Sequence, residues 1–324
     1  MVDLSVIIVS WNVHDLLQRC LESIPRPTEV IWGKASRAAA TGPVAAELSL
    51  EIIVVDNAST DGSVEMLRVG YPDVKLIANE DNRGFSVANN QGIDVAQGRY
   101  AMLLNPDTEI VGNALQKLVK YADQHPGVAM VVPQLRNPDG TVQSSRRRFP
   151  TLWTALFEST WLEPCAPACL LEGYYVGDQP DEEVQDVDWV TGAAMLVRRE
   201  AIDGVGPLDE DFFMYSEELD WCKRLREGGW RIVYLPTAQV IHHAGKSSEQ
   251  VVAARHRHFQ TSKVRYFRKH HGVLTAEALR WWLLANYAWQ LGLESGKWLA
   301  GHKRPLRAQR ISAYREVLGS GLRA

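Results

Sequence analysis

The sequence predicts an α/β fold with a mostly parallel sheet flanked by helices, followed by a helical C-terminal extension. Two observations carry the prediction. Short apolar runs at residues 4–9, 51–55 and 100–104 are typical of buried strands, and segments with apolar residues at helical spacing separate them. Beyond Ser248 the sequence is helical in pattern and basic. Strands that alternate with helices at this spacing indicate βαβ units with right-handed connections.

The expected elements of the first half follow one another in a regular order. Residues 33–48 interrupt this order, because they are rich in Gly and Ala and weakly patterned, and an inserted surface loop or a poorly ordered segment is expected there. Strands are expected at residues 4–9, 51–55, 75–77, 100–104 and 128–132, and helices at 15–24, 59–68, 85–96 and 113–124.

The pattern changes after Pro133. A hairpin-like stretch is expected at residues 136–150, and a loop rich in Pro and acidic residues at about 163–186. Further strands are expected at 188–198 and 230–235.

Charge is unevenly distributed along the chain. Residues 251–324 contain 14 Lys/Arg and 3 Asp/Glu, a balance of +11, whereas the whole chain of 324 residues has a net charge of −4. A basic extension on an acidic body suggests an anionic partner for the extension, and no nucleic-acid-binding module accompanies it. The N-terminus lacks the pattern of a signal peptide, and no apolar run reaches the roughly 18 residues of a spanning helix. We therefore expect a cytoplasmic protein, with the inner face of the membrane as an alternative place.

Asp107 is the first candidate functional residue. It follows the apolar run at residues 100–104 in the sequence Asn105-Pro106-Asp107, where Pro106 cannot continue a central strand. A carboxylate is thereby placed at the C-terminal edge of a sheet, where open α/β folds bind ligands. It could hold a divalent cation and, through it, a diphosphate. A simple Asn-Pro-Asp turn is the alternative.

Other polar residues follow the expected strands in the same way. Asp56 follows the strand at 51–55, and Ser59 or Thr60 is expected to cap the next helix while Asp56 points across the strand ends. Asn82 and Asn89 supply amide groups beside the next crevice, where Gly84 permits a close backbone approach. A helix cap and a solvated helix face are the simpler explanations.

Two further groups carry titratable side chains. Glu217 and Glu218 directly precede Leu219-Asp220 and lie beside an aromatic cluster, which can raise a carboxylate pKa and suit a general base. An acidic helix N-terminus is the alternative. His242, at the end of an apolar run, is a candidate metal ligand, although a structural histidine is commoner.

Taken in order, these stretches resemble the family 2 inverting glycosyltransferases with the GT-A fold, and in particular their rhamnosyltransferase-like bacterial branch. The resemblance implies a GT-A catalytic domain at 1–250, with a nucleotide-sugar-binding half at 1–110 and an acceptor-binding half at 111–250, and an extension at 251–324. The matching stretches are SVIIVSWN, EIIVVDNASTDGS, NRGFSVANNQGI, LLNPDTEI, WVTGAAMLVRR, FFMYSEELDWCKR and HHAGKSS.

The resemblance also implies roles for single residues. Ser10 and Asn12 would line the nucleoside pocket, and Asp56 would contact the nucleobase or ribose. Asn105-Pro106-Asp107 matches the family's Asp-x-Asp motif with an amide in first place, so Asp107 would be the main acidic ligand of Mg²⁺ or Mn²⁺. The implied nucleotide-sugar site comprises Ser10, Asn12, Asp56, Asn82, Gly84, Asn89, Asn105, Asp107 and Gly192.

The remaining implied roles concern the second metal ligand and the base. His242 would join Asp107 at the metal, with His243 as the alternative. Glu218 occupies the position of the base within the pair Glu217-Glu218, and Asp220 is the alternative base. The implied reaction is inverting transfer of rhamnose or a similar sugar from a dTDP- or UDP-linked donor. The acceptor would be a glycan or a polyprenyl-diphosphate-linked hydroxyl in cell-wall or surface polysaccharide synthesis.

Three questions stay open at this point. Asn105 replaces the first aspartate of the family's motif, and Glu218 replaces the aspartate of its base position. Because of these two differences, a nucleotide-sugar-binding protein with a degenerate, non-catalytic site is an alternative. The arginines at 146–148 would contact a phosphate or form a solvated basic loop. The aromatic, basic residues at 263–300 suit peripheral contact with an anionic membrane, or packing on the catalytic domain or on the second subunit of a homodimer.

Overall fold

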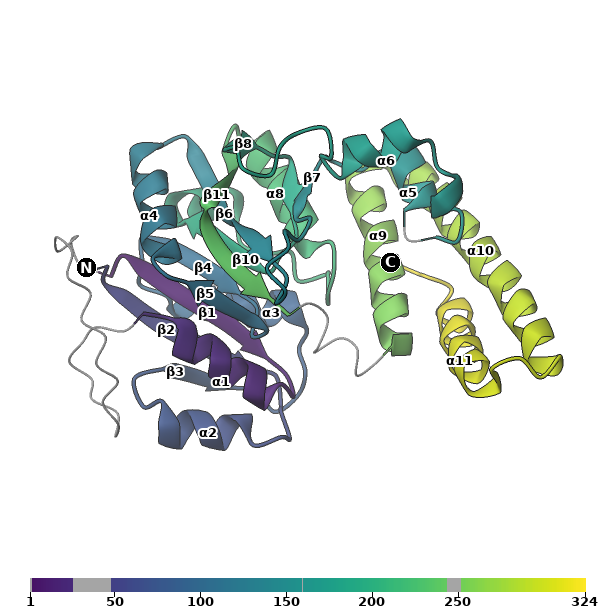
Figure 1. The fold of residues 1–324 in the computed structure, drawn as a ribbon, viewed down its shortest axis with the longest axis horizontal. Coiled ribbons are helices and arrows are strands. Elements are labelled where there is room, and N and C mark those ends of the chain that lie inside the picture. Colours follow the sequence, from purple (N-terminus) through teal and green to yellow (C-terminus); the bar gives the residue numbers. More distant parts are fainter. Residues whose placement is uncertain (1, 26–47, 159, 244–251) are drawn as a thin grey trace.

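The computed structural model describes residues 2–25, 48–158, 160–243 and 252–324 (Figure 1). The main sheet has the strand order β3-β2-β1-β4-β10-β6-β11-β5, and β8 pairs with β11 beside this path. Its strands are β1 (Leu4–Ser10), β2 (Leu50–Asp56), β3 (Lys75–Ala78), β4 (Tyr100–Leu104), β5 (Thr108–Val111), β6 (Val128–Arg136), β8 (Gln185–Asp186), β10 (Ala194–Arg198) and β11 (Arg231–His242).

Helices cover both faces of this sheet, because alternate strand residues point to opposite sides. Val6 and Ile8 belong to the core under α1, α2 and α4, whereas Ile7 and Val9 belong to the core under α3, α7 and α8. The helices are α1 (His14–Ser23), α2 (Ser63–Gly70), α3 (Phe85–Val95), α4 (Ala114–Gln124), α7 (Arg199–Val205) and α8 (Glu217–Glu227).

The C-terminal extension is a helical layer beside the sheet domain (Figure 1). It has its own core, which includes Phe267, Leu283 and Val317 and also takes in Phe212 and Leu219 from the sheet domain. Its helices are α9 (Val252–His271), α10 (Val273–Leu299) and α11 (Arg304–Ser320), and α5 (Leu152–Phe157) and α6 (Ala168–Tyr174) lie at one end of them. The predicted α/β sheet with a helical extension is confirmed.

The structure differs from the predicted elements in several places. β5 was not predicted, and the expected domain division after residue 110 falls inside it. Strands β10, β5 and β8 run antiparallel to their neighbours, whereas the other strands of the sheet share one direction, so the predicted mostly parallel sheet is confirmed. The expected loop at 163–186 contains the 3₁₀ turn Glu163–Cys165 as well as α6 and β8.

Two of the expected elements begin or divide elsewhere. The helix expected from residue 59 begins at Ser63, because Ser59 Oγ accepts a hydrogen bond from the Asn12 N–H instead of capping a helix. The strand expected at 188–198 is two strands, β9 (Trp189–Val190) and β10, and β9 pairs with β7 (Arg146–Arg147). The proposed insertion at 33–48 and the domain boundary at 250 lie almost wholly outside the described residues.

Candidate active site

A cavity of about 460 Å³ opens at the C-terminal ends of β1, β2 and β4. Because these strands are parallel, the polar residues that follow them meet at one edge of the sheet. The start of α3, the start of α8 and one side of α9 close the cavity. Its lining includes Trp11, Asn57, Asn82, Gly84, Asn105, Asp107, Gly192, Phe213, Tyr215, Glu217, Glu218, His242, Arg255 and His258.

Ser10 and Asp56 lie side by side at the ends of β1 and β2. Both are buried, and Ser10 Oγ and Asp56 Oδ2 have no hydrogen-bond partner among the described residues. Asp56 Oδ1 accepts a hydrogen bond from the Ser59 N–H at 2.8 Å. An unsatisfied buried carboxylate oxygen is costly unless a ligand pairs with it, so this edge is suited to a hydroxyl or N–H of a bound molecule.

Asn12 was expected to line the nucleoside pocket, but it is not among the residues that line the cavity. It adopts a left-handed backbone with φ of 51°, and its Oδ1 accepts a hydrogen bond from the Thr60 N–H at 2.7 Å. Its side chain therefore holds the turn after β2, while the neighbouring Trp11 and Asn57 line the cavity. Asn89 is buried within α3, does not line the cavity, and donates to the carbonyl oxygen of Phe85.

Gly84 stands where the chain turns into α3. Its φ is +85°, its N–H donates to Asn82 Oδ1 at 3.0 Å, and its carbonyl accepts from Asn57 Nδ2. A Cβ at this position would lie 2.6 Å from the carbonyl oxygen of Phe213. Glycine is therefore required both by the backbone angle and by the close approach of the 213 segment.

Asp107 and His242 meet at the other side of the cavity. The antiparallel pairing of β5 with β11 aligns Thr108 with His242, and Asp107 Oδ1 lies 3.4 Å from His242 Nε2. His242 Nδ1 is hydrogen-bonded to Gln143 Oε1 at 2.7 Å, which orients the ring so that Nε2 is the nitrogen on the side of Asp107. His243 instead contacts Glu109 at 2.7 Å.

The donor atoms at this place fit a hard divalent cation that is also bound by phosphate oxygens. Asn105 Oδ1 is buried without a hydrogen-bond partner among the described residues. Asn105 precedes Asp107 by two residues and lines the same cavity as Asp107 and His242. No group of three His, Cys, Asp or Glu side chains gathers to hold a metal within the described ranges. A cation here would therefore complete its shell with diphosphate and water oxygens, as Mg²⁺ commonly does.

Glu217 and Glu218 begin α8 after a strained turn. Tyr215 and Ser216 both have positive φ, at 69° and 63°, a backbone that costs energy in residues other than glycine. Burial raises the pKa of Glu218 from 4.5 to about 7, although nearby backbone N–H groups lower it. Burial also raises the pKa of Glu217 well above its ordinary value, and the charge of Glu218 adds to that rise.

Asp220 is placed away from the cavity. Its fully buried carboxylate accepts hydrogen bonds from Arg224 and from His270, at 2.9 and 2.8 Å, and pairs with Lys269 at 2.8 Å. Burial by itself would raise the pKa of Asp220, but hydrogen bonds from His270, Lys269 and Arg224 outweigh it and lower the pKa to about 2. Asp220 thus ties α9 to α8 and is a poor proton acceptor.

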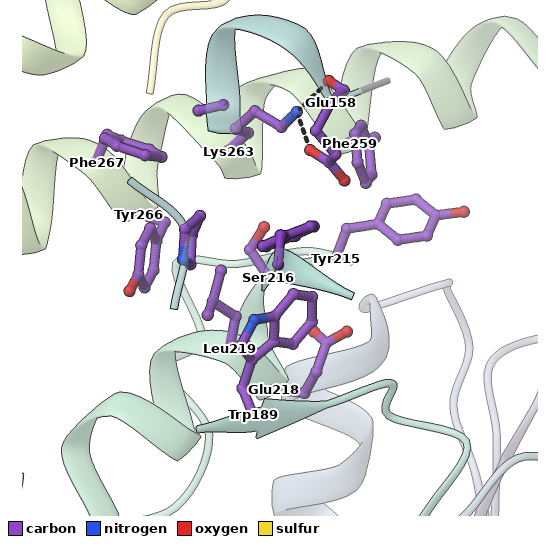
Figure 2. A pocket seen from close by; sticks show the side chains of 13 residues that line it. Glu158, Trp189, Tyr215, Ser216, Glu218, Leu219, Phe259, Lys263, Tyr266 and Phe267 are labelled. Atoms are coloured by element: carbon purple, nitrogen blue, oxygen red, sulfur yellow. Dashed lines mark hydrogen bonds and ion pairs between the residues drawn. The ribbon is translucent and has the colours of Figure 1, made fainter. Parts of the chain in front are cut away.

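A second cavity of about 60 Å³ lies behind Glu218, which lines both cavities. Figure 2 shows its lining, in which Lys263 of α9 reaches Glu158 at the end of α5. Tyr215, Trp189 and Phe259 contribute aromatic surface around it. Glu218 therefore lies between the cavity of about 460 Å³ and this smaller aromatic cavity at the boundary of the helical extension.

The three consecutive arginines are occupied by protein groups. Arg146 is buried, bonds Gln185 and Asp181, and stacks on Tyr234 with 4.9 Å between its guanidinium and the ring. Arg147 stacks over Tyr175, and Arg148 pairs with Asp178. None of the three lines the cavity of about 460 Å³.

Comparison with known proteins identifies the family. The model of glycosyl transferase family 2 matches residues 5–204. The chain belongs to this family. It is 29% identical over 256 residues to the N-acetylglucosaminyl-diphospho-decaprenol L-rhamnosyltransferase of Mycobacterium tuberculosis, covering 76% of this chain and 83% of the relative. It is 27% identical over 175 residues to the rhamnosyltransferase WbbL of Escherichia coli K12, covering 53% and 62%.

Solved structures show the fold of this glycosyltransferase. The mannosyltransferase PcManGT from Pyrobaculum calidifontis, in complex with GDP-Man and Mn²⁺, matches with a TM-score of 0.54 at 19% identity and covers 98% of this chain and 87% of its own. GalNAc-T7 with UDP, GalNAc and Mn²⁺ matches with a TM-score of 0.55 at 18% identity, covering 75% and 43%. The expected GT-A fold and the rhamnosyltransferase-like branch of family 2 are confirmed.

Several cavity residues of the glycosyltransferase were missed by the sequence analysis. Trp11 lies between two residues that were chosen, and an aromatic residue directly after a strand is a signal that could have found it. Phe213 and Tyr215 precede the glutamate pair. Arg255 and His258 come from α9, and His258 stacks on Phe213 with 4.6 Å between ring centroids. No sequence signal connected these two residues to the strand ends of the cavity, whose Asp107 lies more than 140 positions upstream.

Replacing Asp220 by asparagine should destabilise the glycosyltransferase without abolishing turnover. The change removes one member of a buried charge cluster and should cost about 3 kcal/mol of unfolding free energy. Since the pKa of Asp220 is lowered from 3.8 to about 2, its contribution is present above pH 3.8 and is lost as the pH falls through about 2. Urea unfolding and sugar-transfer rates measure the two effects, with exposed Asp211→Asn as the control. Loss of kcat at unchanged stability would instead make Asp220 catalytic.

Proposed function

We propose that this glycosyltransferase moves rhamnose or a similar sugar from a nucleotide-diphosphate donor to a glycan or polyprenyl-diphosphate-linked hydroxyl, with inversion. Cell-wall or surface polysaccharide synthesis is the proposed setting. The observation that carries the proposal is one cavity that contains both the Asp107–His242 pair and a glutamate with a raised pKa, Glu218. The names of the rhamnosyltransferase relatives support the sugar and the lipid-linked acceptor.

The donor would lie along the cavity with its nucleoside over the ends of β1 and β2. Trp11 lines the cavity and would stack on the base. Ser10 and Asp56 do not line the cavity themselves but directly adjoin Trp11 and Asn57, which do, and their buried oxygens without a partner among the described residues would bond to the nucleoside. Arg255 borders the same cavity from α9 and can attract the diphosphate. His258 borders it as well, but burial lowers the pKa of this histidine, so it would act as a neutral hydrogen-bonding group. This arrangement would direct the sugar toward Glu218.

The diphosphate end would be held by the pair on β5 and β11. Asp107 and His242 would hold Mg²⁺ or Mn²⁺, which supplies positive charge that stabilises the departing nucleotide diphosphate. Gln143 fixes the His242 ring so that Nε2 faces this position. Asn105 lines the cavity, and its buried amide oxygen has no hydrogen-bond partner among the described residues. The amide is neutral, so Asp107 is the sole carboxylate of the motif.

Glu218 would act as the general base. Its carboxylate takes the proton from the acceptor hydroxyl, whose oxygen bonds to the anomeric carbon as the bond to the nucleotide diphosphate breaks on the opposite face. One displacement of this kind inverts the configuration. A carboxylate with a pKa of about 7 is a stronger proton acceptor than an ordinary glutamate and is still ionised in part at neutral pH.

A thermal-shift series with nucleotide diphosphates tests donor binding. dTDP and UDP should raise the melting temperature more than GDP or ADP, and the rise should need Mn²⁺ or Mg²⁺, because a ligand that binds only the folded state stabilises it. At a ligand concentration about 100 times its Kd the gain is about 2.7 kcal/mol. Equal shifts without any metal would contradict the role of Asp107 and His242.

A non-catalytic nucleotide-sugar-binding protein is not favoured, because the base candidate and the metal-ligand candidates share one cavity. Incubation with dTDP-rhamnose and a polyprenyl-diphosphate-linked N-acetylglucosamine, followed by mass spectrometry of the lipid product, tests the full reaction. A product heavier by one deoxyhexose, with inverted anomeric configuration, is expected. Donor binding without transfer to any glycan or lipid-linked hydroxyl, and without metal-dependent donor hydrolysis, would overturn the catalytic proposal.

A further inference from the structure

The outer side of α10 is an apolar surface that no other described element covers. Exposed, uncharged residues recur along it at helical spacing, as at Leu274, Ala278, Trp281, Ala285 and Trp289, and they continue to Leu299. We call this surface the α10 stripe. Trp281, Trp289 and Leu299 are exposed by 63%, 56% and 72%. A stripe on a helix of 27 residues is about 40 Å long.

The acidic side chains of α10 point away from the stripe. Glu294 is buried and pairs with Arg307, and Glu277 pairs with Arg268 and Arg280 toward the neighbouring helices. Along α10, which the structure describes in full, Lys297 is the one exposed charged residue. An exposed apolar surface of this extent on a monomer marks an interaction site.

Two tryptophans of α10 lie beside cations. The guanidinium of Arg280 lies 5.0 Å from the ring centroid of Trp281, and that of Arg304 lies 5.4 Å from the ring centroid of Trp298. Tryptophan beside a cation is typical of protein surfaces that lie in the interface of a bilayer. The extension as a whole has a balance of +11, with 14 Lys/Arg and 3 Asp/Glu at 251–324.

We propose that the α10 stripe docks the enzyme on an anionic phospholipid leaflet, with α10 parallel to the membrane plane. The apolar residues would enter the boundary between headgroups and acyl chains, while Lys297 and Arg304 contact lipid phosphates. None of the described helices is long and apolar enough to cross a membrane. A second copy of this chain is a less favourable partner for the stripe than a membrane, because two extensions with a charge of +11 each would repel each other.

The position of the stripe agrees with this orientation. Figure 1 shows α10 at the outer edge of the helical extension, away from the sheet domain, with α9 between them. Since α9 lines the catalytic cavity and α10 packs against α9, docking through the outer side of α10 would leave the cavity uncovered, with the two helices between it and the lipid. The inference stands without the proposed reaction, because vesicle binding is measured without a substrate.

Co-flotation of the full chain with vesicles tests the proposal. Binding is expected to phosphatidylcholine vesicles that contain phosphatidylglycerol, with much weaker binding to phosphatidylcholine alone. The double change Trp281→Ser/Trp289→Ser should lower the partition coefficient by about tenfold or more, because it removes two large apolar side chains from the interface. The matched control is Val69→Ser. Val69 lies on α2 of the sheet domain, its side chain is 70% exposed, and its replacement should leave vesicle binding unchanged.

A second variant keeps the test independent of any folding defect in the first. Lys297→Glu/Arg304→Glu leaves the stripe intact and should reduce the preference for anionic vesicles and its dependence on salt. Failure of the full chain to bind either vesicle would overturn the proposal, as would unchanged binding by the double tryptophan variant. A dimer that these tryptophan changes dissociate, with no vesicle binding, would assign the stripe to a second copy.

Discussion

Replacing Glu218 by glutamine should lower kcat by about a hundred-fold to ten-thousand-fold, the range that loss of one general base commonly costs. Glutamine keeps the size and hydrogen-bonding shape of the side chain but cannot accept the acceptor proton. KM for the nucleotide sugar should change little, because the donor contacts lie on the other side of the cavity. Steady-state transfer rates at saturating donor measure the effect.

The same variant should be more stable than the wild type in alkaline solution. Burial raises the pKa of Glu218 from 4.5 to about 7, so its stabilising contribution is complete below pH 4.5 and is lost as the pH rises through about 7. Glutamine stays neutral, so Glu218→Gln should gain about 1–3 kcal/mol of unfolding free energy at about pH 8 and almost none at about pH 4. A stable but inactive variant separates catalysis from folding.

The pH dependence of the wild type gives an independent check. Since the base must be ionised, kcat/KM should rise as the pH increases through about 7 and should then level off, which gives the acidic limb of the pH profile. The limb should be absent from the residual activity of Glu218→Gln. If Glu218→Gln kept near-full turnover while Asp220→Asn abolished it, the base would be Asp220, and the geometry of its Arg224, His270 and Lys269 partners would have to change on substrate binding.

Replacing Asp107 by alanine should abolish metal-dependent donor binding. Loss of an outer-shell partner of a metal already costs about tenfold to a hundred-fold in affinity, and Asp107 is the one carboxylate of its motif. Thermal shifts by dTDP or UDP should therefore no longer respond to Mn²⁺. The loss should be more complete than in a relative that has two aspartates in this motif.

Two companion variants sharpen that result. Exposed Glu65→Ala on α2 removes a carboxylate far from the cavity and should leave the Mn²⁺ response unchanged. Asn105→Asp places a second carboxylate where a buried, unpaired amide oxygen now stands and should strengthen Mn²⁺ binding. An unaltered Mn²⁺ response in Asp107→Ala would show that the cation, if bound, lies elsewhere.

Much of the sheet and several site residues were predictable, because the signals are local. A buried strand needs only a short apolar run, and a polar residue directly after it lies at the sheet edge, which located Asp56 and Asp107. Gly84 was chosen because glycine permits a close backbone approach, and Phe213 makes that approach at the start of α3. By contrast, β5 has four residues and directly follows the Asn-Pro-Asp turn, so no local pattern separated it from a loop.

The choice between acidic residues depended on packing. Residues two positions apart on a helix point about 200° away from each other, so Glu218 and Asp220 had to face different surroundings. Sequence cannot say which of them faces the cavity. In the described part of the chain, Asp220 has three cationic partners, whereas Glu218 is buried with one oxygen that lacks a hydrogen-bond partner. These surroundings move the two pKa values in opposite directions.

The order of the motifs along the chain was enough to establish an α/β glycosyltransferase of family 2 and the kind of chemistry its carboxylates can perform. Contacts between distant segments settled the rest. The pairing of β5 with β11 brings His242 to Asp107, and the packing of α9 on the sheet domain brings Arg255 and His258 to the donor cavity. Hydrophobic patterns report which residues are buried, whereas the pairing of distant strands and the burial of single charges arise only when the whole chain has folded.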